Sequence, residues 1–194
     1  MRVHGDIRIT RSSNVILEKD YSNYRDPLLA DFSNICGYCG KHISVAKKGF
    51  EIDHFVPIST DETRICDYNN LVMSCFTCNR KKGPKWPTED KELCHDGFHG
   101  FVDPATDEFD THLGRDLNGA IEHYTDVGDY MCGVFKFSIR PTDIVWKSME
   151  LVKRKKQLYN IRKNSKLDND EKELFIEIQE ELDRLLEYLL GEGE

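Results

Sequence analysis

Asp53 and His54 stand side by side in a short apolar stretch, EIDHFVP, at residues 51–57. An unpartnered carboxylate or imidazole in a buried strand costs free energy, so such a pair needs a reason. An imidazole near a phosphate can take a proton from water, and a carboxylate is a suitable ligand for a divalent cation. The pair is therefore a candidate for one corner of a hydrolytic metal site.

Four of the seven cysteines form two C-x2-C pairs, 36 residues apart between Cys39 and Cys75. Each pair, Cys36 with Cys39 and Cys75 with Cys78, can present two thiolates to one ion, and four thiolates complete a tetrahedral structural zinc site. The alternative is a set of reduced core cysteines. The N-terminus, MRVHGDIRIT, has no hydrophobic signal core, so a disulfide framework is not expected. We therefore expect structural Zn²⁺.

One zinc ion would draw the two pairs together and bring EIDH close to CNRKKG, in which Asn79 follows Cys78 directly. The Asp53 carboxylate and the Asn79 amide oxygen would then face each other across a small gap, with His54 beside them. Hard oxygen ligands with free water positions suit Mg²⁺. Neighbouring residues of a strand point to opposite faces, so Asp53 and His54 share one site only with a twist or bulge at the strand end.

The segments CGYCGK, EIDHFVP and YNNLVMSCFTCNRKKG, in this order, resemble the HNH endonucleases, specifically the zinc-bearing branch of the ββα-metal nucleases. The resemblance spans about Cys36–Gly83. It implies an α+β fold with a ββα-metal nuclease core and a four-cysteine zinc knuckle, to which further C-terminal helices are added. It also implies that His54 is the general base and that Asp53 and Asn79 bind Mg²⁺ or Mn²⁺.

The same resemblance implies that Asn70 pins the loop between the two strands through backbone hydrogen bonds and so orients His54. Its neighbour Asn69 could play this part instead, since an asparagine in a turn is ordinary. Asparagine rather than histidine at position 79 favours Mg²⁺ or Mn²⁺ over a bound transition metal. A helix cap is the alternative role for Asn79, and Glu51 is either a supporting residue or a solvated side chain.

A basic cluster follows the expected metal ligand in CNRKKGPKW. Its side chains can contact phosphates, which position a duplex without reading its sequence, and the alternative is a solvated helix end. The candidate nucleic-acid contacts are Arg80, Lys81, Lys82 and Lys85. A further motif, CHDGFH with Cys94, His95 and His99, is either a second metal site or a set of unrelated polar loop residues.

The elements that must position these residues follow from local patterns. GFEIDHFVP and LVMSC are strand candidates, and FTCNRKKG predicts a short helix that ends at Gly83. Upstream we expect a short edge strand within residues 1–12 and a helix in DPLLADF with Asp26 as its N-cap. Downstream, YMCGVFKFSI is a strand candidate, and Thr142 begins a helix over about 142–163.

A last helix is predicted over about 169–190, where apolar residues recur every three or four positions and Gly191 follows as a stop. The stripe consists of Leu174, Ile178, Leu182, Leu185 and Leu189. It packs on its own domain or docks a partner. The chain thus divides into an N-terminal extension with a lead-in helix (1–35), a nuclease core (36–86), a loop-rich extension (87–141) and a C-terminal helical region (142–194).

The net charge of −8 is unevenly distributed. Residues 36–86 hold 8 basic and 5 acidic side chains, whereas residues 87–129 hold 2 basic and 12 acidic ones. Total charge argues against non-specific nucleic-acid binding, but the local charge allows basic faces. No apolar run approaches the roughly 20 residues that a membrane helix needs. We therefore expect a cytoplasmic protein with no membrane partner.

The expected function is that of a metal-dependent endonuclease that hydrolyses DNA phosphodiester bonds. The downstream segments are similar to those of small stand-alone bacterial HNH proteins, some of which act beside an ATPase subunit in anti-phage defence. That similarity implies a defence role and an ATPase or other subunit as a partner of the C-terminal helices. The alternative is a zinc-stabilised nucleic-acid-binding or adaptor module that cuts only with a partner or not at all.

Overall fold

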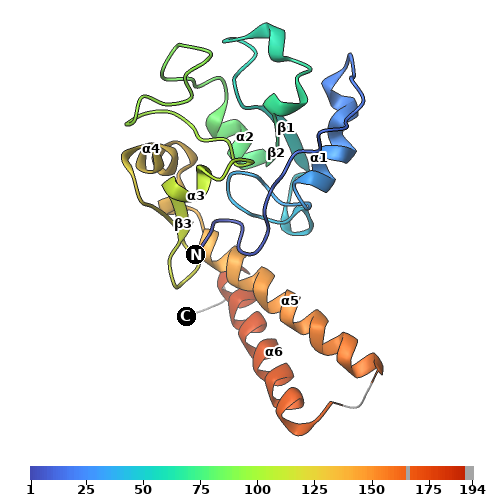
Figure 1. Cartoon of the computed structure of the whole chain (residues 1–194). Helices are drawn as coiled ribbons and strands as arrows, with labels where there is room; N and C mark the ends of the chain where they lie inside the picture. Colours follow the sequence, from blue (N-terminus) through green and yellow to red (C-terminus); the bar gives the residue numbers. More distant parts are fainter. Residues whose placement is uncertain (165–166, 191–194) are drawn as a thin grey trace. The chain divides into compact units, whose positions relative to one another are not determined.

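The computed structural model describes residues 1–164 and 167–190 (Figure 1). It divides the chain into two compact units, Met1–Thr142 and Asp143–Glu194, which are described separately below. Within the described residues, no helix is both long enough and apolar enough to span a membrane.

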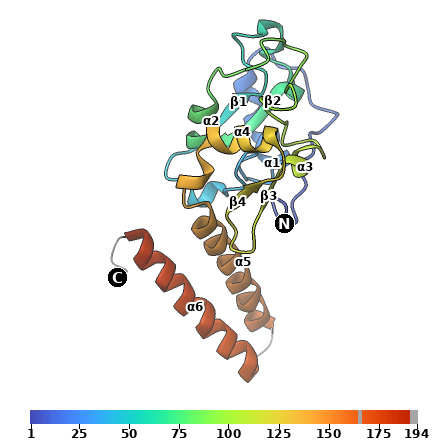
Figure 2. The ribbon, with the colours of Figure 1, turned by 90° about the vertical axis from the view of Figure 1, so that its left-hand side faces the viewer.

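The first unit is built around an antiparallel strand pair, β1 (Phe50–His54) and β2 (Leu71–Cys75). The two strands pair residue to residue, from Phe50 opposite Cys75 to His54 opposite Leu71, without a bulge. Helix α2 (Phe76–Lys82) follows β2 directly and lies against the pair, as both views show (Figure 1 and Figure 2). These three elements confirm the predicted strand–strand–helix core.

Helix α2 ends where the sequence predicts. Gly83 follows its last residue with φ of 52°, a left-handed value that favours glycine, and the Gly83 N–H donates to the Asn79 carbonyl at 2.8 Å. The stop fixes the length of α2 at two turns.

Helix α1 (Arg25–Asp31) differs from prediction at its start. It begins at Arg25 with Tyr24 as its N-cap, so Asp26 lies in the first turn instead of capping it. A preceding 3-10 helix, Tyr21–Tyr24, explains the shift, because Asp20 caps that turn by accepting a hydrogen bond from Ser22 N. The turn then runs directly into α1.

Residues 1–12 do not form the predicted edge strand. A turn at the start breaks the extended pattern, since Gly5 N donates to the Arg2 carbonyl at 3.1 Å. The buried guanidinium of Arg115 instead fixes this segment through a hydrogen bond of 2.8 Å from Nε to the Val3 carbonyl. The apolar residues Val3 and Ile9 are buried nonetheless.

The remaining part of this unit contains α3 (Phe109–His112), β3 (Leu113–Arg115), β4 (Ile121–His123) and α4 (Asp126–Phe135). The predicted strand YMCGVFKFSI is wrong, because most of it lies in α4 and the 3-10 helix Phe137–Ile139. Thr125 caps α4 by accepting a hydrogen bond from Gly128 N at 3.1 Å. Buried Val127, Met131 and Phe135 recur at a spacing of four, which places all three on one face of a helix.

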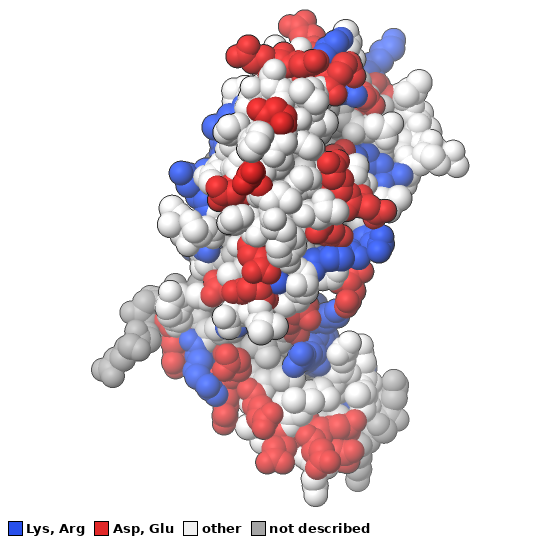
Figure 3. All heavy atoms as spheres, turned by 60° about the vertical axis from the view of Figure 1, so that its left-hand side comes forward, with Lys and Arg blue, Asp and Glu red and all other residues white. Residues whose placement is uncertain are grey.

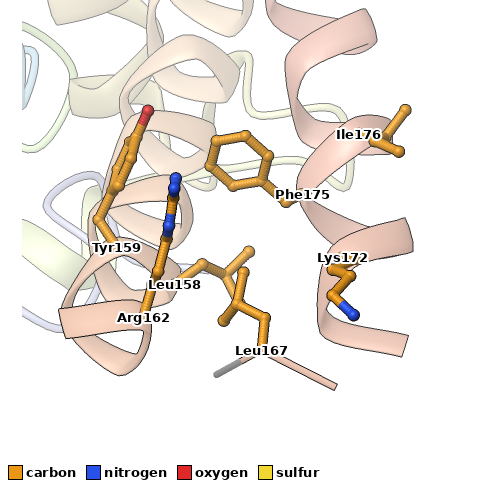
Figure 4. Close-up of a pocket in the computed structure, with 7 residues that line it drawn as sticks. All are labelled: Leu158, Tyr159, Arg162, Leu167, Lys172, Phe175 and Ile176. Atoms are coloured by element: carbon orange, nitrogen blue, oxygen red, sulfur yellow. The ribbon is translucent and has the colours of Figure 1, made fainter. Parts of the chain in front are cut away.

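The second unit contains α5 (Thr142–Asn164), whose first residue belongs to the first unit, and α6 (Asn169–Leu190). Both predicted helices are confirmed, while the predicted stop at Gly191 lies outside the described residues. The Phe175 ring points toward α5 and meets Tyr159 at 5.3 Å (Figure 4). Leu158 of α5 and Ile178 of α6 are buried, whereas Leu174 is exposed. The apolar stripe of α6 thus packs only in part.

His4 is a buried histidine of the first unit. Its Nε2 lies 2.6 Å from the Gly37 carbonyl, and its ring stacks on Phe109 at 5.3 Å. Burial lowers the pKa of His4 to about 4, from 6.5. The folded protein therefore holds His4 neutral at a pH where the unfolded chain takes up a proton.

Replacing His4 with glutamine should reduce the acid sensitivity of this unit. The unfolded state binds the additional proton between pH 6.5 and pH 4, so the wild-type protein loses stability as the pH falls through that window. Between pH 6.5 and pH 4 the unfolding free energy of the wild-type protein should fall by about 3 kcal/mol more than that of His4→Gln. Urea unfolding of both proteins at the two pH values measures this difference. The exposed His123, changed to glutamine, is the control. An equal pH dependence for wild type and His4→Gln would contradict the assignment.

Candidate zinc and catalytic sites

The four paired cysteines converge on one buried point. Their sulfur atoms lie within 4.8 Å of one another, and Cys39 Sγ is 3.9 Å from Cys75 Sγ. A tetrahedral zinc ion with Zn–S bonds of about 2.3 Å has sulfur–sulfur edges of about 3.8 Å, so the cluster fits Zn²⁺. At the first pair, Gly40 has φ of 68° and donates its N–H to the Cys36 carbonyl at 2.8 Å. All four ligand positions would be filled by protein, as in a structural site.

Arg140 completes the surroundings of the cysteines, and sequence reasoning missed it. Its guanidinium nitrogens lie 3.3 Å from Cys78 Sγ and 3.8 Å from Cys39 Sγ. Hydrogen bonds from neighbouring thiols, first from Cys36, lower the pKa of Cys39, and the Arg140 charge lowers it further. No sequence spacing marks this residue, because it stands 62 positions after Cys78.

Replacing Cys36 with serine should remove zinc and destabilise the first unit, because metal affinity is part of the folding free energy of such sites. The expected result is loss of the tightly bound zinc, measured by mass spectrometry, together with a lower thermal midpoint. Cys132, which lies outside the cluster, gives the matched control Cys132→Ser. A soluble Cys36→Ser protein with unchanged stability and no zinc would contradict the structural role.

His54 ends β1 and is almost buried, with 9% of its surface exposed. Its Nε2 lies 2.9 Å from the Ile65 carbonyl, and its ring meets the edge of Tyr21 at 4.8 Å. A carbonyl only accepts hydrogen bonds, so in the neutral ring Nε2 carries the hydrogen and Nδ1 keeps its lone pair. This is the tautomer in which Nδ1 can act as a base.

Asn70 closes the loop that holds His54. Its Oδ1 accepts a hydrogen bond from Val56 N at 2.8 Å, and its Nδ2 donates to the Val56 carbonyl at 3.0 Å. Its own carbonyl accepts from Phe55 N at 2.8 Å. Asn70 is buried, while its neighbour Asn69 is exposed. Of the two asparagines, Asn70 is thus the one whose side chain ties the strand ends together.

Asp53 is buried and already has two partners. It accepts a hydrogen bond of 2.5 Å from the Tyr38 hydroxyl, and Lys82 Nζ lies 3.3 Å from its Oδ2. The same ammonium donates to the His54 carbonyl at 2.8 Å. Burial raises the pKa of Asp53 and lowers that of Lys82, while their mutual attraction opposes both shifts. Tyr38 and Lys82 are therefore part of this site, although sequence reasoning gave neither of them this role.

The expected phosphate contact by Lys82 is wrong. Its side chain has no exposed surface, and its ammonium is held between Asp53 and the His54 carbonyl. The helix period explains the difference, because Asn79 and Lys82 are three residues apart and share the face of α2 that packs on β1. Arg80, Lys81 and Lys85 are exposed.

Asn79 faces β1 through Glu51. Its Nδ2 lies 2.6 Å from Glu51 Oε2, and Arg80 pairs with the other carboxylate oxygen at 3.3 Å. Asn79 does not cap the helix, because Cys75 holds the N-cap position of α2. Since the amide nitrogen points to Glu51, the amide oxygen of Asn79 is the atom left to face a ligand.

The structure places Asp53 and Asn79 on the facing sides of β1 and α2, but it does not bring all the predicted residues into contact. In the regular register of β1, Asp53 turns to Lys82 and Tyr38, whereas the His54 ring turns to Tyr21. Within the described part of the chain, no hydrogen bond joins Asp53 to Asn79. Their donor atoms, a carboxylate and an amide oxygen, are the hard ligands that suit Mg²⁺ or Mn²⁺.

Removing the Lys82 ammonium should leave a buried carboxylate without its cation. Breaking such a pair typically destabilises a protein by about 3–5 kcal/mol, which is the loss expected for Lys82→Met in urea unfolding. Lys81→Met is the matched control, because an exposed neighbour should change stability by about 0.5 kcal/mol or less. Equal stability of the two variants would show that Lys82 and Asp53 do not depend on each other.

Part of the chain is similar to known proteins. The family model for the HNH endonuclease matches residues 36–85. The chain is also similar to the Septu protein PtuB of Bacillus thuringiensis, with 30% identity over 100 residues, which cover 47% of this chain and 35% of that protein. The chain thus spans about a third of the length of this relative. No solved structure matches the chain. Residues 36–85 thus match an HNH endonuclease domain, and the chain is similar over part of its length to a Septu protein.

Proposed function

We propose that this protein is a metal-dependent HNH endonuclease that hydrolyses DNA phosphodiester bonds. The observation that carries the proposal is His54 at the end of β1, inside the matched HNH domain, with Nε2 tied to the Ile65 carbonyl. That bond leaves the Nδ1 lone pair to take a proton from water as the water attacks phosphorus. Asn70 is the positioning residue, because it fixes the loop that carries Ile65.

A divalent ion, Mg²⁺ or Mn²⁺, would be held by Asp53 and Asn79. When bound, it would stabilise the negative charge that develops on the departing oxygen. Glu51 holds the amide nitrogen of Asn79 at 2.6 Å and so turns the amide oxygen to the ion. Lys82 balances the buried charge of Asp53 while the ligand is positioned. The carboxylate would keep the Tyr38 hydrogen bond as an outer support.

DNA would contact exposed basic side chains in α2 and just after it. Arg80 and Lys81 directly follow Asn79, Lys85 follows α2, and all three are open to solvent. Contacts from such side chains to phosphates are not specific for sequence and weaken as salt rises. We therefore propose that Arg80, Lys81 and Lys85, but not the buried Lys82, hold the DNA backbone near His54.

We also propose a role in anti-phage defence, which the similarity to a Septu protein supports. In that role the chain would be the nuclease subunit of a complex, with an ATPase or other subunit as its partner. The C-terminal helices are the part proposed to bind it, because α6 leaves Leu174, Ile176 and Leu186 exposed.

The second candidate function is that of a zinc-stabilised adaptor that cuts only inside such a complex. Two observations favour it: the net charge of −8, and the Asp53 carboxylate that is already paired with Lys82. A protein that binds DNA but leaves it intact when alone would support this alternative over the first.

The test is plasmid nicking by the purified full chain with Mg²⁺ or Mn²⁺, with and without EDTA. His54→Ala should lower the cleavage rate by about 10²–10⁴-fold, the usual contribution of a general base, with unchanged zinc content. His123→Ala, an exposed histidine on β4, is the control and should cut like wild type. A fully active His54→Ala protein would overturn the mechanism.

A further inference from the structure

A second group of metal-ligating side chains lies in the first unit, outside the site between β1 and α2. His95, Glu108 and His112 each offer one ligand atom, and these atoms lie within 4.8 Å of one another. Glu108 Oε1 is 3.0 Å from His95 Nε2 and 3.5 Å from His112 Nε2. Of the motif CHDGFH only His95 takes part, since His99 is exposed and faces Asp96.

Two features of the backbone position these three residues. His95 forms an antiparallel bridge with Gly100, and a Cβ added to Gly100 would lie 2.4 Å from the Cβ of His95, so no larger residue fits at position 100. Glu108 directly precedes α3 and His112 is its last residue. Their spacing of four places both on one face of a helical turn.

The outer nitrogen of His112 has the support that metal-ligating histidines usually have. Its Nδ1 lies 2.6 Å from Thr125 Oγ1, an oxygen that also accepts a hydrogen bond from Gly128 N. When Nδ1 carries the hydrogen, Nε2 turns a lone pair to the Glu108 carboxylate, and two acceptors then face each other. A cation between them satisfies both.

His95 has no competing polar partner. Its Nδ1 is buried and has no hydrogen-bond partner within the described residues, so the polar contact of the ring is with Glu108. The ring is therefore directed at the cluster and not at a hydrogen-bond network elsewhere.

We propose that His95, Glu108 and His112 bind a divalent transition metal ion, and specifically Zn²⁺. Two imidazoles and one carboxylate suit Zn²⁺ better than Mg²⁺ or Ca²⁺, which prefer oxygen ligands. Three protein ligands leave coordination positions for water, and the Glu108 side chain is 53% exposed. The ion would therefore exchange with solvent, in contrast to zinc in the buried four-cysteine cluster.

The surrounding charge favours a cation at this place. The three ligands lie in the segment 87–129, which holds 12 acidic and only 2 basic side chains. Acidic side chains are prominent on the face seen in Figure 3. Such a negative potential raises the local concentration of divalent ions. The bound ion would tie the loop around His95 to α3, which would give the segment 87–129 a structural role.

The experiment is equilibrium dialysis of the full chain, with its four-cysteine site loaded, against buffered free Zn²⁺, with metal counted by mass spectrometry. Wild type should bind one exchangeable zinc ion that His95→Ala lacks. Glu108→Gln should weaken that zinc by about tenfold or more, which is at least the effect of changing an outer support. His99→Ala, in the same loop, should bind zinc as wild type does.

The same measurements in the Asn79→Ala background separate this zinc from any ion held between β1 and α2. Zinc binding by His95→Ala and Glu108→Gln equal to that of wild type would overturn the proposal. So would an exchangeable zinc that only Asn79→Ala removes. A variant counts as folded if it keeps the zinc held by the four cysteines and if its thermal midpoint without added metal is unchanged. If His95→Ala fails this check, Glu108→Gln decides, because its side chain is half exposed.

Discussion

The convergence of four cysteine sulfurs is the constraint on which the rest of the first unit depends. Cys75 is the last residue of β2 and Cys78 lies in the first turn of α2, so one ion bound by the cluster would fix the corner between strand and helix. That corner decides which face of α2 meets β1, and therefore where Asn79 and Lys82 point. A rotation of α2 by one residue would turn Lys82 away from Asp53 and break their ion pair.

The part of the fold that was predictable from sequence is the part with short-range signals. Strand β1 ends at His54, three residues before Pro57, and β2 leads directly into α2, which ends where Gly83 takes a positive φ. The segment 130–139 was predicted as a strand because a short apolar run fits a buried strand or a helix equally well. Its cap, Thr125, and the spacing of Met131 and Phe135 decide for a helix.

The membership of the candidate site stays a prediction from the sequence, and the side-chain contacts within it could not be predicted. Spacing from the cysteines marks Asp53, His54 and Asn79, because one ion must bring their segments together. The partners Tyr38, Lys82 and Arg140 depend on how side chains pack across segments, and no local pattern encodes that. Lys82 looks like its basic neighbours in the sequence, and only the period of α2 separates it from them.

The double contact of Lys82 has an electrostatic consequence for the order of binding. With its ammonium between Asp53 and the His54 carbonyl, the site carries an internal counter-ion and is close to neutral before any divalent ion arrives. In the proposed mechanism, a dication that approaches Asp53 would meet this fixed positive charge at short range, and a phosphate that enters with it would offset the repulsion. Ion and substrate would then bind cooperatively, and each would raise the affinity for the other by the same factor.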